Sequence, residues 1–376
     1  MHAKPKRADS LAVVDHPMTR DGEAVDLAKL LTVAEFEAIA RERLPAGAYV
    51  YVSGGSGDER TMRDNIEAFT RWQFIPRVLV DTTRRDLSTT LLGRDVALPV
   101  GIAPFALQGL LHPEGEVATA RAATSANIFM ALSMGANRTI EEVGAAARCP
   151  LWFQPYLFDD RVYMSELVER AERAGYVALC LTVDSPVSGR RDGALRVPAT
   201  LPDGMTWANM PPELRRPSGS WLRGGEAWSW DDVDRIRDAT RLGLVVKGIL
   251  HPDDAVKAVE HGARAIVVSN HGGRQLDDSI ASLDALPAIV DAVAGRAEVV
   301  LDGGVRRGID VLKALALGAR AVLIGRATAW GLSVGGQAGV ERVLELLRVE
   351  LSVALAIAGV TSVKDVPRAL LVKRMR

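Results

Sequence analysis

The chain of 376 residues carries 46 Lys and Arg against 47 Asp and Glu, for a formal net charge of −1, and is 48% hydrophobic. This balance argues against a nucleic-acid or anionic-membrane surface as the main partner, and no run approaches the ~18 apolar residues of a membrane span. With only Cys149 and Cys180, and no CxxC pair, neither a disulfide framework nor a metal site is expected. No signal peptide is visible, and we expect a cytoplasmic protein.

The N-terminal part is expected to precede the main repeat of the fold. Residues 1–30, charged and without periodicity, predict a flexible tail, and residues 31–376 are expected to form one catalytic domain. Thr32 and Glu35 have the spacing of a capping box at the start of a helix. Tyr49 and Tyr51 run into three glycines at 54–57, which predicts a turn, either near a ligand or beside two core tyrosines. A second helix is expected over 58–69, followed by short strands and turns over 72–98.

A repeating pattern of apolar strands and amphipathic helices begins at residue 98. Helical patterns such as 164–174, 253–261 and 309–317 separate most of the strands, and buried parallel strands need such crossovers. The pattern predicts an α/β fold of the TIM (β/α)8 barrel class with an N-terminal helical extension; an open doubly wound sheet is the alternative. The eight predicted strands span residues 98–104, 128–133, 151–156, 177–184, 243–249, 265–270, 298–304 and 321–326.

One connection is much longer than a helix requires. Residues 185–242 separate the fourth and fifth strands and include Trp207, Trp221, Trp228 and Trp230. Long loops on the C-terminal face of a barrel are often lids over the site, so we expect a lid here. After the last strand, apolar residues from 340 to 351 predict a packing helix.

The sixth strand ends in the most informative stretch, Ser-Asn-His-Gly-Gly-Arg at 269–274. His271 supplies a base and Arg274 an anion-binding group at the strand end where parallel α/β folds place their chemistry. The alternative is a polar junction in which the histidine caps a neighbouring backbone group.

Other strand ends carry polar groups or glycines as well. Gly303-Gly304 and Gly325-Arg326 follow the two strands that commonly hold phosphate in such barrels, although ordinary glycine-rich turns with solvated arginines would look the same. No GxGxxG fingerprint follows the first strand, which argues against NAD.

These stretches together resemble a known family. The motifs at 269–277, 301–308 and 246–248, with His-Pro-Glu-Gly at 112–115 and Thr-Val-Asp at 182–184, are similar to the signatures of FMN-dependent 2-hydroxy acid oxidases and dehydrogenases. Glycolate oxidase, lactate oxidase and mandelate dehydrogenase belong to that family. The resemblance runs from about residue 33 to the C-terminus, and it implies FMN as cofactor and a homotetramer.

The resemblance also implies residue roles. Lys247 would lie beside the flavin N1/O2 edge, and the other residues expected to bind FMN are Ala103, Pro104, Ala106, Ser133, Gln154, Thr182, Ser269, Asp302, Gly303, Gly304, Arg306, Gly325 and Arg326. Substrate binding is assigned to Tyr51, Tyr156, Arg191 and Arg274, with the last on the carboxylate. His271 would take the hydroxyl proton while the C2 hydrogen leaves to flavin N5. Asp184 would orient His271.

The chemistry of a 2-hydroxy acid suits these residue types without the family. The carboxylate favours a bidentate Arg, the hydroxyl proton suits His near neutral pH, and the hydride needs a cofactor. Together with the resemblance, this leads us to expect an oxidoreductase acting on a CH–OH group, which oxidises an L-2-hydroxy acid to the 2-oxo acid and is reoxidised by O2 to give H2O2. A dehydrogenase with another acceptor, a metabolite-tailoring FMN oxidase and a phosphate-binding barrel without turnover are the alternatives.

Two departures concern the substrate. By the resemblance, Gly135 stands at a position where plant glycolate oxidases carry Trp, so we expect a roomier pocket here. A roomier pocket favours a bulky or aromatic substrate such as a mandelate, with lactate as the alternative. Pro155 replaces the usual Leu between Gln154 and Tyr156, and we have no account of its effect.

Overall fold

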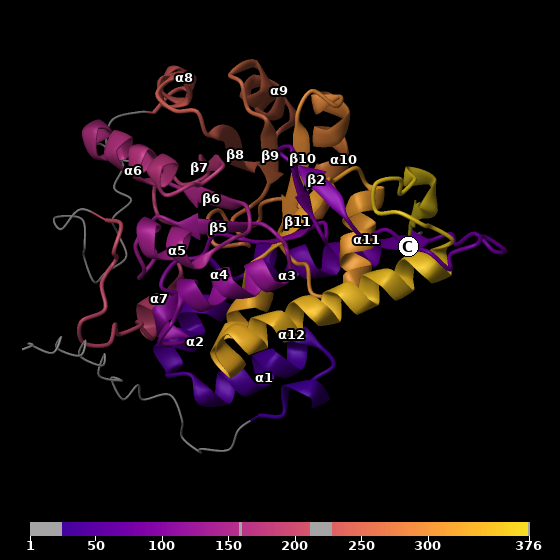
Figure 1. Cartoon of the computed structure of the whole chain (residues 1–376), viewed down its shortest axis with the longest axis horizontal. Coiled ribbons are helices and arrows are strands. Elements are labelled where there is room, and N and C mark those ends of the chain that lie inside the picture. The colour runs from indigo at the N-terminus through magenta and orange to yellow at the C-terminus, as the bar shows by residue number, and fades with distance from the viewer. Residues whose placement is uncertain (1–24, 158–159, 211–227, 375–376) are drawn as a thin grey trace, which may run out of the picture.

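Eight parallel strands close into a barrel in the computed structural model, which describes residues 25–157, 160–210 and 228–374 (Figure 1). Strands that follow one another in the chain lie side by side, and the last one closes the barrel against the first. The predicted TIM barrel is therefore confirmed, and the open doubly wound sheet is wrong. The barrel strands are β4 (Val100–Ile102), β5 (Met130–Ser133), β6 (Leu151–Gln154), β7 (Ala178–Thr182), β8 (Gly243–Ile249), β9 (Ala265–Val268), β10 (Glu298–Asp302) and β11 (Ala321–Ile324).

Helices surround the barrel and connect its strands. Between strands lie α4 (Glu116–Ser125), α5 (Ile140–Ala146), α6 (Arg161–Arg173), α8 (Trp230–Asp238), α9 (Pro252–Glu260), α10 (Ser282–Val293) and α11 (Gly308–Ala316). The packing helix predicted over 340–351 is part of α12 (Arg326–Ala358), which begins directly after β11 and is interrupted at Gly335 and Gly336. At the ends of α9 and α11, Gly262 and Gly318 have positive φ, as helix-ending glycines do.

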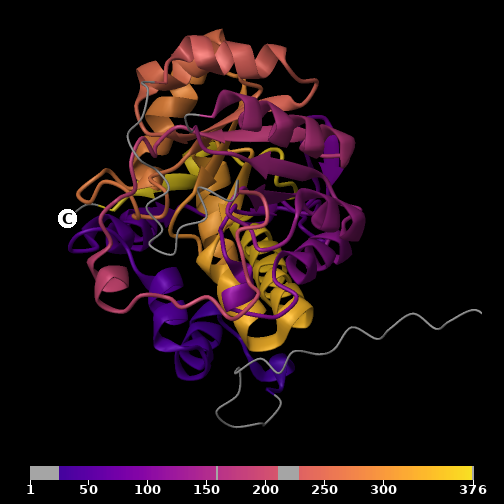
Figure 2. The ribbon, with the colours of Figure 1, turned by 90° about the vertical axis from the view of Figure 1, so that its left-hand side faces the viewer.

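The N-terminal extension consists of η1 (Leu27–Lys29), α1 (Val33–Arg43), α2 (Ala46–Ser53), α3 (Arg60–Glu67) and η2 (Ala68–Arg71). In Figure 1, α1 and α2 lie at the bottom of the view, below the barrel, where both contact α12, and Figure 2 shows the same indigo helices at the lower edge. The capping box of Thr32 and Glu35 is present. The turn predicted around Tyr49 and Tyr51 begins only after Ser53, because both tyrosines lie on α2.

The predicted tail lies mostly outside the described residues, which begin at residue 25. Residues 25–30 include η1, and Arg342 on α12 donates hydrogen bonds to the carbonyl oxygens of Ala28 and Leu30. The extension therefore starts a few residues earlier than the sequence pattern indicates.

Short strands over 72–98 are confirmed. β1 (Trp72–Phe74) pairs antiparallel with β12 (Leu371–Lys373) near the C-terminus, and η5 (Arg368–Leu370) precedes that strand. β2 (Thr89–Leu91) and β3 (Arg94–Val96) form a hairpin, and its Leu91 and Val96 pack with the inward-facing residues of the barrel strands. The remaining short helix, η3 (Gln108–Leu110), follows β4.

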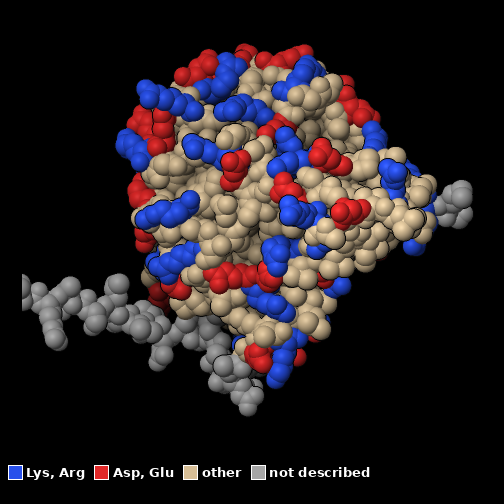
Figure 3. Space-filling view, turned by 45° about the vertical axis from the view of Figure 1, so that its right-hand side comes forward, with Lys and Arg blue, Asp and Glu red and all other residues tan. Residues whose placement is uncertain are grey.

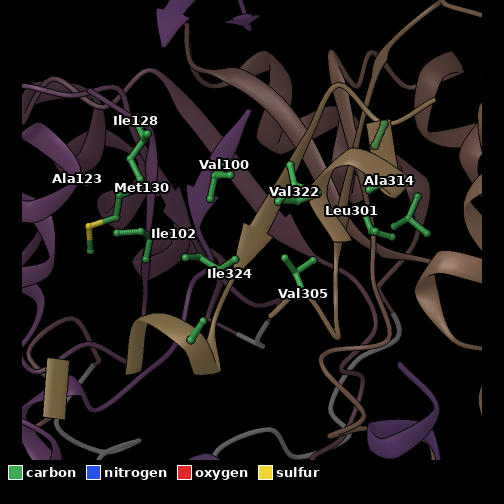
Figure 4. Packing of buried hydrophobic residues seen from close by; sticks show 14 of the residues in the cluster. Val100, Ile102, Ala123, Ile128, Met130, Leu301, Val305, Ala314, Val322 and Ile324 are labelled. Carbon is green, nitrogen blue, oxygen red and sulfur yellow. The ribbon is translucent and has the colours of Figure 1, made fainter. Parts of the chain in front are cut away.

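Side chains of the barrel strands alternate between two apolar layers, as the period of a strand requires. On β8, Leu244 and Val246 face the surrounding helices, whereas Val245 packs inside the barrel. Figure 4 shows the outer layer, in which Val100 and Ile102 of β4 lie beside Val322 and Ile324 of β11. The same alternation then places the next residue on each inner row at the mouth of the barrel.

The predicted lid is described at residues 185–210 and 228–242, and Trp221 lies outside these ranges. Its first part contains α7 (Asp192–Arg196) and then approaches the loop after β5: the N–H of Ala208 donates to the carbonyl oxygen of Ala136 at 2.9 Å.

Neither sign of charge dominates the face of the molecule shown in Figure 3. Basic and acidic side chains are interspersed on the face shown in Figure 3. Among the described helices, none combines the length and apolar character needed to cross a membrane.

Candidate active site

The inner rows of most barrel strands end in polar residues, whereas the residues below them are apolar. Alternation along the strands brings the last residues of the eight inner rows to one end of the barrel. Six of them are polar side chains that are almost completely buried, and the other two are small. They are Ala103, Ser133, Gln154, Thr182, Lys247, Ser269, Asp302 and Gly325, all of which the sequence assigns to cofactor binding.

A cavity opens above this ring, between the loops that follow the strands and helix α2. The predicted site residues that line it are Tyr51, Ala103, Pro104, Ala106, Tyr156, Arg191, Lys247, His271, Arg274, Asp302, Gly303, Gly304, Arg306, Gly325 and Arg326. The other predicted residues, Ser133, Gln154, Thr182, Asp184 and Ser269, do not line it. Of these, Asp184 lies against His271, and the other four are buried.

His271 and Asp184 form a hydrogen-bonded pair. Nδ1 of His271 lies 3.0 and 3.2 Å from the two carboxylate oxygens of Asp184. Burial opposes ionisation of Asp184, but the imidazole, its hydrogen bond and Lys247 outweigh it and hold the pKa of Asp184 at about 2. Because an ionised carboxylate only accepts, Nδ1 carries the proton and Nε2 is left with its lone pair.

The imidazole is poised to accept a proton. Burial lowers the pKa of His271 below its usual 6.5; the attraction of Asp184 opposes this shift, and the charge of Lys247 adds to it. Nε2 lies 3.4 Å from the hydroxyl of Tyr156, whose pKa burial raises to about 12. A neutral base therefore faces the cavity beside a protonated phenol.

Arginine side chains make the cavity strongly positive. Arg274 lies with its guanidinium 5.3 Å from the ring centre of Tyr51 and donates to the carbonyl oxygens of Tyr51 and Gly54 at 2.8 and 2.7 Å. Arg191 donates to the carbonyl oxygen of Arg274. Among the described residues, Asp192 pairs with Arg190 and Arg196 and not with Arg191, and the main charges acting on Arg274 come from arginines and tyrosines, not from a carboxylate. Burial and the nearby Arg191 lower the pKa of Arg274 to about 9, so an anion would relieve real repulsion here.

Lys247 brings a positive charge into the floor of the cavity. Its Nζ donates to Ser269 Oγ at 3.2 Å and lies 3.4 Å from a carboxylate oxygen of Asp302. Burial disfavours the ammonium, but Asp302 and Asp184 outweigh burial and raise the pKa of Lys247. Ser269 Oγ also accepts from the N–H of His271 at 3.0 Å. Ser269 thus links the lysine to the histidine.

The far side of the cavity fits the phosphate and polyol of flavin mononucleotide. Gly303 and Gly304 have φ of 96° and 83°, and Gly325 begins α12 without a side-chain cap, so backbone N–H groups are available to a phosphate. Arg306 and Arg326 add two guanidinium groups. Buried oxygen atoms of Thr182 and Asp302 also have no hydrogen-bond partner within the described residues, which is the state expected of side chains that serve a bound group.

Three residues at the site were not singled out by the sequence. Gln275 donates to the carbonyl oxygens of Asp184 and Val187, and Ser185 Oγ donates to Asp184 at 3.1 Å. Gln275 lies in the same motif as His271, so its place in the sequence could have identified it as a site residue. Nothing in the sequence around Ser185 would have done so. Trp207 of the lid lines the cavity, and its Cδ1 lies 3.8 Å from where a Cβ on Gly135 would be.

Comparison with known proteins gives consistent matches. Residues 40–373 match the family described as FMN-dependent dehydrogenase. The chain is 49% identical over 356 residues to an L-lactate oxidase from Nostoc sp., which covers 91% of this chain and 98% of the relative. It is 43% identical to glycolate oxidase from Spinacia oleracea, over 91% of this chain and 95% of the relative.

Solved structures of mandelate oxidase are also similar. One with benzoyl-formic acid has a TM-score of 0.85 at 41% sequence identity and covers 92% of this chain and 99% of that one. Another, with (S)-2-phenylpropionate, gives the same values.

Proposed function

The chain belongs to the FMN-dependent dehydrogenase family, and we propose that it oxidises an L-2-hydroxy acid to the corresponding 2-oxo acid with FMN as cofactor. Bound FMN supplies the two-electron acceptor that no side chain offers. The observation that carries the proposal is the convergence in one cavity of a neutral His271, held by Asp184, and an Arg274 without a carboxylate partner within the described residues.

The side chains divide the work on the substrate. Arg274 binds the carboxylate, with Arg191 and Tyr51 beside it, because a planar guanidinium matches two carboxylate oxygens. His271 Nε2 accepts the proton of the hydroxyl, and Tyr156 donates a hydrogen bond to that oxygen. Asp184 keeps Nδ1 protonated and stabilises the imidazolium.

The residues around the floor would hold the cofactor. Arg306, Arg326 and the backbone at Gly303, Gly304 and Gly325 provide a phosphate site. Lys247 would stabilise negative charge on the reduced ring, and its raised pKa keeps it charged at neutral pH. The other residues offered for the cofactor are Ala103, Pro104, Ala106, Ser133, Gln154, Thr182, Ser269 and Asp302.

An apolar wall favours a bulky or aromatic substituent on C2. Phe105, Leu107 and Trp207 line the cavity, and none of these side chains offers a charge to a polar substrate group. The likeness to mandelate oxidase points the same way. Lactate is the second candidate, because the chain is also 49% identical to an L-lactate oxidase.

Oxygen is the proposed final acceptor. The two electrons and two protons taken from the hydroxy acid then leave as H2O2, so one O2 is consumed for each 2-oxo acid formed. The similar proteins are described as oxidases, which supports this choice over a dehydrogenase with another acceptor.

Anaerobic mixing of the yellow holoenzyme with L-mandelate, L-lactate and glycolate tests the function. We expect the flavin absorbance to bleach with at least one of these acids and to return in air with stoichiometric H2O2. Bleaching without recovery in air would favour the dehydrogenase. No bleaching by any 2-hydroxy acid would overturn the proposal.

We also propose a cytoplasmic homotetramer. Val349, Val353 and Ile357 recur at four-residue spacing on α12 and are 44, 51 and 70% exposed. Arg77, hydrogen-bonded to Ala358 at the end of α12, is followed by the exposed Val78 and Leu79. Such an apolar surface suits a subunit contact.

A further inference from the structure

The loop that carries His271 has an unusual backbone. His271, Gly272 and Gly273 have φ of 59°, 65° and 73°, so three consecutive residues lie in the left-handed region. A histidine tolerates this conformation better than most side chains, but it needs support from neighbouring groups to hold it. The barrel strand β9 ends at Val268 and cannot provide that support by its own ladder.

A pair of buried amides provides it. Nδ2 of Asn65 donates to Oδ1 of Asn270 at 2.8 Å, and Nδ2 of Asn270 donates to Oδ1 of Asn65 at 2.8 Å. The two residues are 2 and 4% exposed. Because the bonds run in both directions, each carboxamide fixes the orientation of the other.

This pair is connected to the loop and to the start of α10. Oδ1 of Asn270 also accepts from the N–H of Gly273 at 3.1 Å, which closes the left-handed turn. Oδ1 of Asn65 accepts from the N–H of Ser282, and Ser282 Oγ accepts from the N–H of Asn270. The Asn270 side chain is therefore held by Asn65 and by the carbonyl oxygen of Ile280, to which its Nδ2 donates at 3.1 Å. Its Oδ1 closes the histidine turn together with the Asn270 carbonyl oxygen, which also accepts from the N–H of Gly273.

Asn65 also lies against the proposed phosphate turn. A Cβ on Gly304 would come within 2.0 Å of the Asn65 carbonyl oxygen, and one on Gly303 within 3.3 Å of the Asn65 carboxamide. A single residue of α3, outside the barrel, thus contacts the loops after β9 and after β10.

We infer that Asn65 is a positioning residue for the proposed oxidation: through Asn270 it holds the left-handed turn that aims His271 into the cavity. The catalytic importance of Asn65 rests on the proposed function, whereas its hydrogen bonds to Asn270 and Ser282 are present whatever the function is. Arg274 is anchored separately, on the carbonyl oxygens of Tyr51 and Gly54, so the carboxylate site does not depend on Asn65.

The main test is Asn65→Ala in the holoenzyme, with kcat, KM, FMN content and hydrogen–deuterium exchange of residues 269–276 measured. We expect kcat to fall about 10- to 100-fold, the loss that follows when a reacting group is misplaced by about 1 Å. KM and FMN content should change little, because Arg274 and the backbone at residue 65 stay in place. Exchange should become about tenfold faster or more, since Asn270, which closes the turn, loses its two hydrogen bonds to Asn65.

Thr61→Val is the matched control. Thr61 lies on the same helix, is 1% exposed and bonds through its hydroxyl to the carbonyl oxygen of Ser279, away from the histidine turn. This variant should leave kcat and exchange at 269–276 unchanged. If Asn65→Ala does not fold, Asn65→Asp serves instead, because it keeps the acceptor for Asn270 and Ser282 and replaces the donor with a carboxylate oxygen that repels Oδ1 of Asn270.

The outcomes separate the two proposals. Unchanged kcat with unchanged exchange in the Asn65 variants would overturn the positioning role. Equal losses in Asn65→Ala and Thr61→Val would also overturn it, by showing a general effect of α3. A wild-type protein that oxidises no 2-hydroxy acid would overturn the function alone, while faster exchange in the Asn65 variants would still support the network.

Discussion

In the proposed reaction, proton removal from the substrate requires His271 to be neutral when the substrate binds. Its Nδ1 is committed to Asp184, so only Nε2 can accept, and the pair acts as one unit. At the scale of single residues, the proposed reaction therefore depends on the protonation state of His271 and on its Nδ1 donating to Asp184.

The first prediction concerns the base. His271→Ala should lower the rate of anaerobic flavin bleaching by about 10²- to 10⁴-fold, the usual contribution of a general base, while FMN stays bound. Stopped-flow absorbance with the best substrate of the panel measures this rate. His251→Ala, at the exposed start of α9, is the control and should bleach at the parental rate; equal rates for both variants would refute the assignment.

The second prediction is a pH dependence. Because burial lowers the pKa of His271 below 6.5, kcat/KM should rise with pH as the imidazole loses its proton, with the rising limb centred below pH 6.5. The same shift destabilises the fold at acid pH, since the unfolded chain binds the histidine proton more readily than the native one. A rising limb centred above pH 6.5 would contradict this environment for His271.

The third prediction concerns the carboxylate clamp. Arg274→Lys should lower kcat/KM by about 10- to 100-fold, because an ammonium cannot replace a planar fork and one charged hydrogen bond contributes about 1.5–3 kcal/mol. Steady-state kinetics on the same substrate measure the loss. Unchanged kinetics would remove Arg274 from the binding site.

At the scale of elements, the lid contributes Trp207 to the cavity wall, close to Gly135. The extra room expected from Gly135 is not found: a Cβ on Gly135 would lie 2.8 Å from the Cβ of Ala106, so this glycine allows close packing behind the cavity wall, and Trp207 of the lid lines the cavity beside it. Trp207→Ala should lower kcat/KM for mandelate by about 10-fold or more, through lost apolar contact of about 1.5–3 kcal/mol, and affect lactate less. Trp230→Ala, in the same connection but stacked on His261, is the control and should leave the mandelate-to-lactate ratio unchanged.

The turn after β10 offers a stability test. Gly304→Ala should destabilise the fold by about 1–2 kcal/mol for its positive φ and by a further ~1–3 kcal/mol for the clash with the Asn65 carbonyl oxygen. Gly93 has a similar φ of 74°, but a new Cβ there would meet open space. Gly93→Ala should therefore show only the destabilisation that comes from the positive φ. Urea unfolding of both variants measures the difference, and equal losses would contradict the close approach.

The barrel could be predicted because its strands are buried on both sides and their ends change composition abruptly. Each predicted strand lies where one is found, although several end one or two residues early: at Asp302 and Ile324, for example, hydrogen bonding stops where the chain turns toward the cavity. The helix α2 was missed because Tyr49, Val50 and Tyr51 have side chains that favour strands, and packing against α7 and α12 decides the matter.

The residues that line the site could be predicted from the sequence, but the residues that hold them in position could not. His271, Arg274 and Lys247 stand in motifs at strand ends, so the fold alone brings them together. The Asn65 and Asn270 pair joins residues far apart in sequence, and nothing local to Asn65 marks it as the partner of a catalytic loop. Which residues hold a site in place depends on tertiary packing, which the spacing of residues does not reveal.

At the scale of the whole molecule, the apolar side of α12 predicts assembly. Replacing both Val353 and Ile357 with Glu should lower the molar mass measured by light scattering after gel filtration, because charges would then face each other across the contact. Val162→Glu on α6, 72% exposed in the parent, is the control and should keep the parental mass. A single monomer mass for the unmodified protein would contradict the tetramer.

The closure of the barrel has a consequence for how the chain is made. The strand β4 finds one of its two neighbours in β11 and β1 finds its partner in β12, both from the far end of the chain. During synthesis the earliest strands must therefore wait with an open edge until the ribosome has delivered the latest ones. An open strand edge can pair with another chain, so a nascent chain stalled before β11 should bind chaperones that do not bind the finished protein.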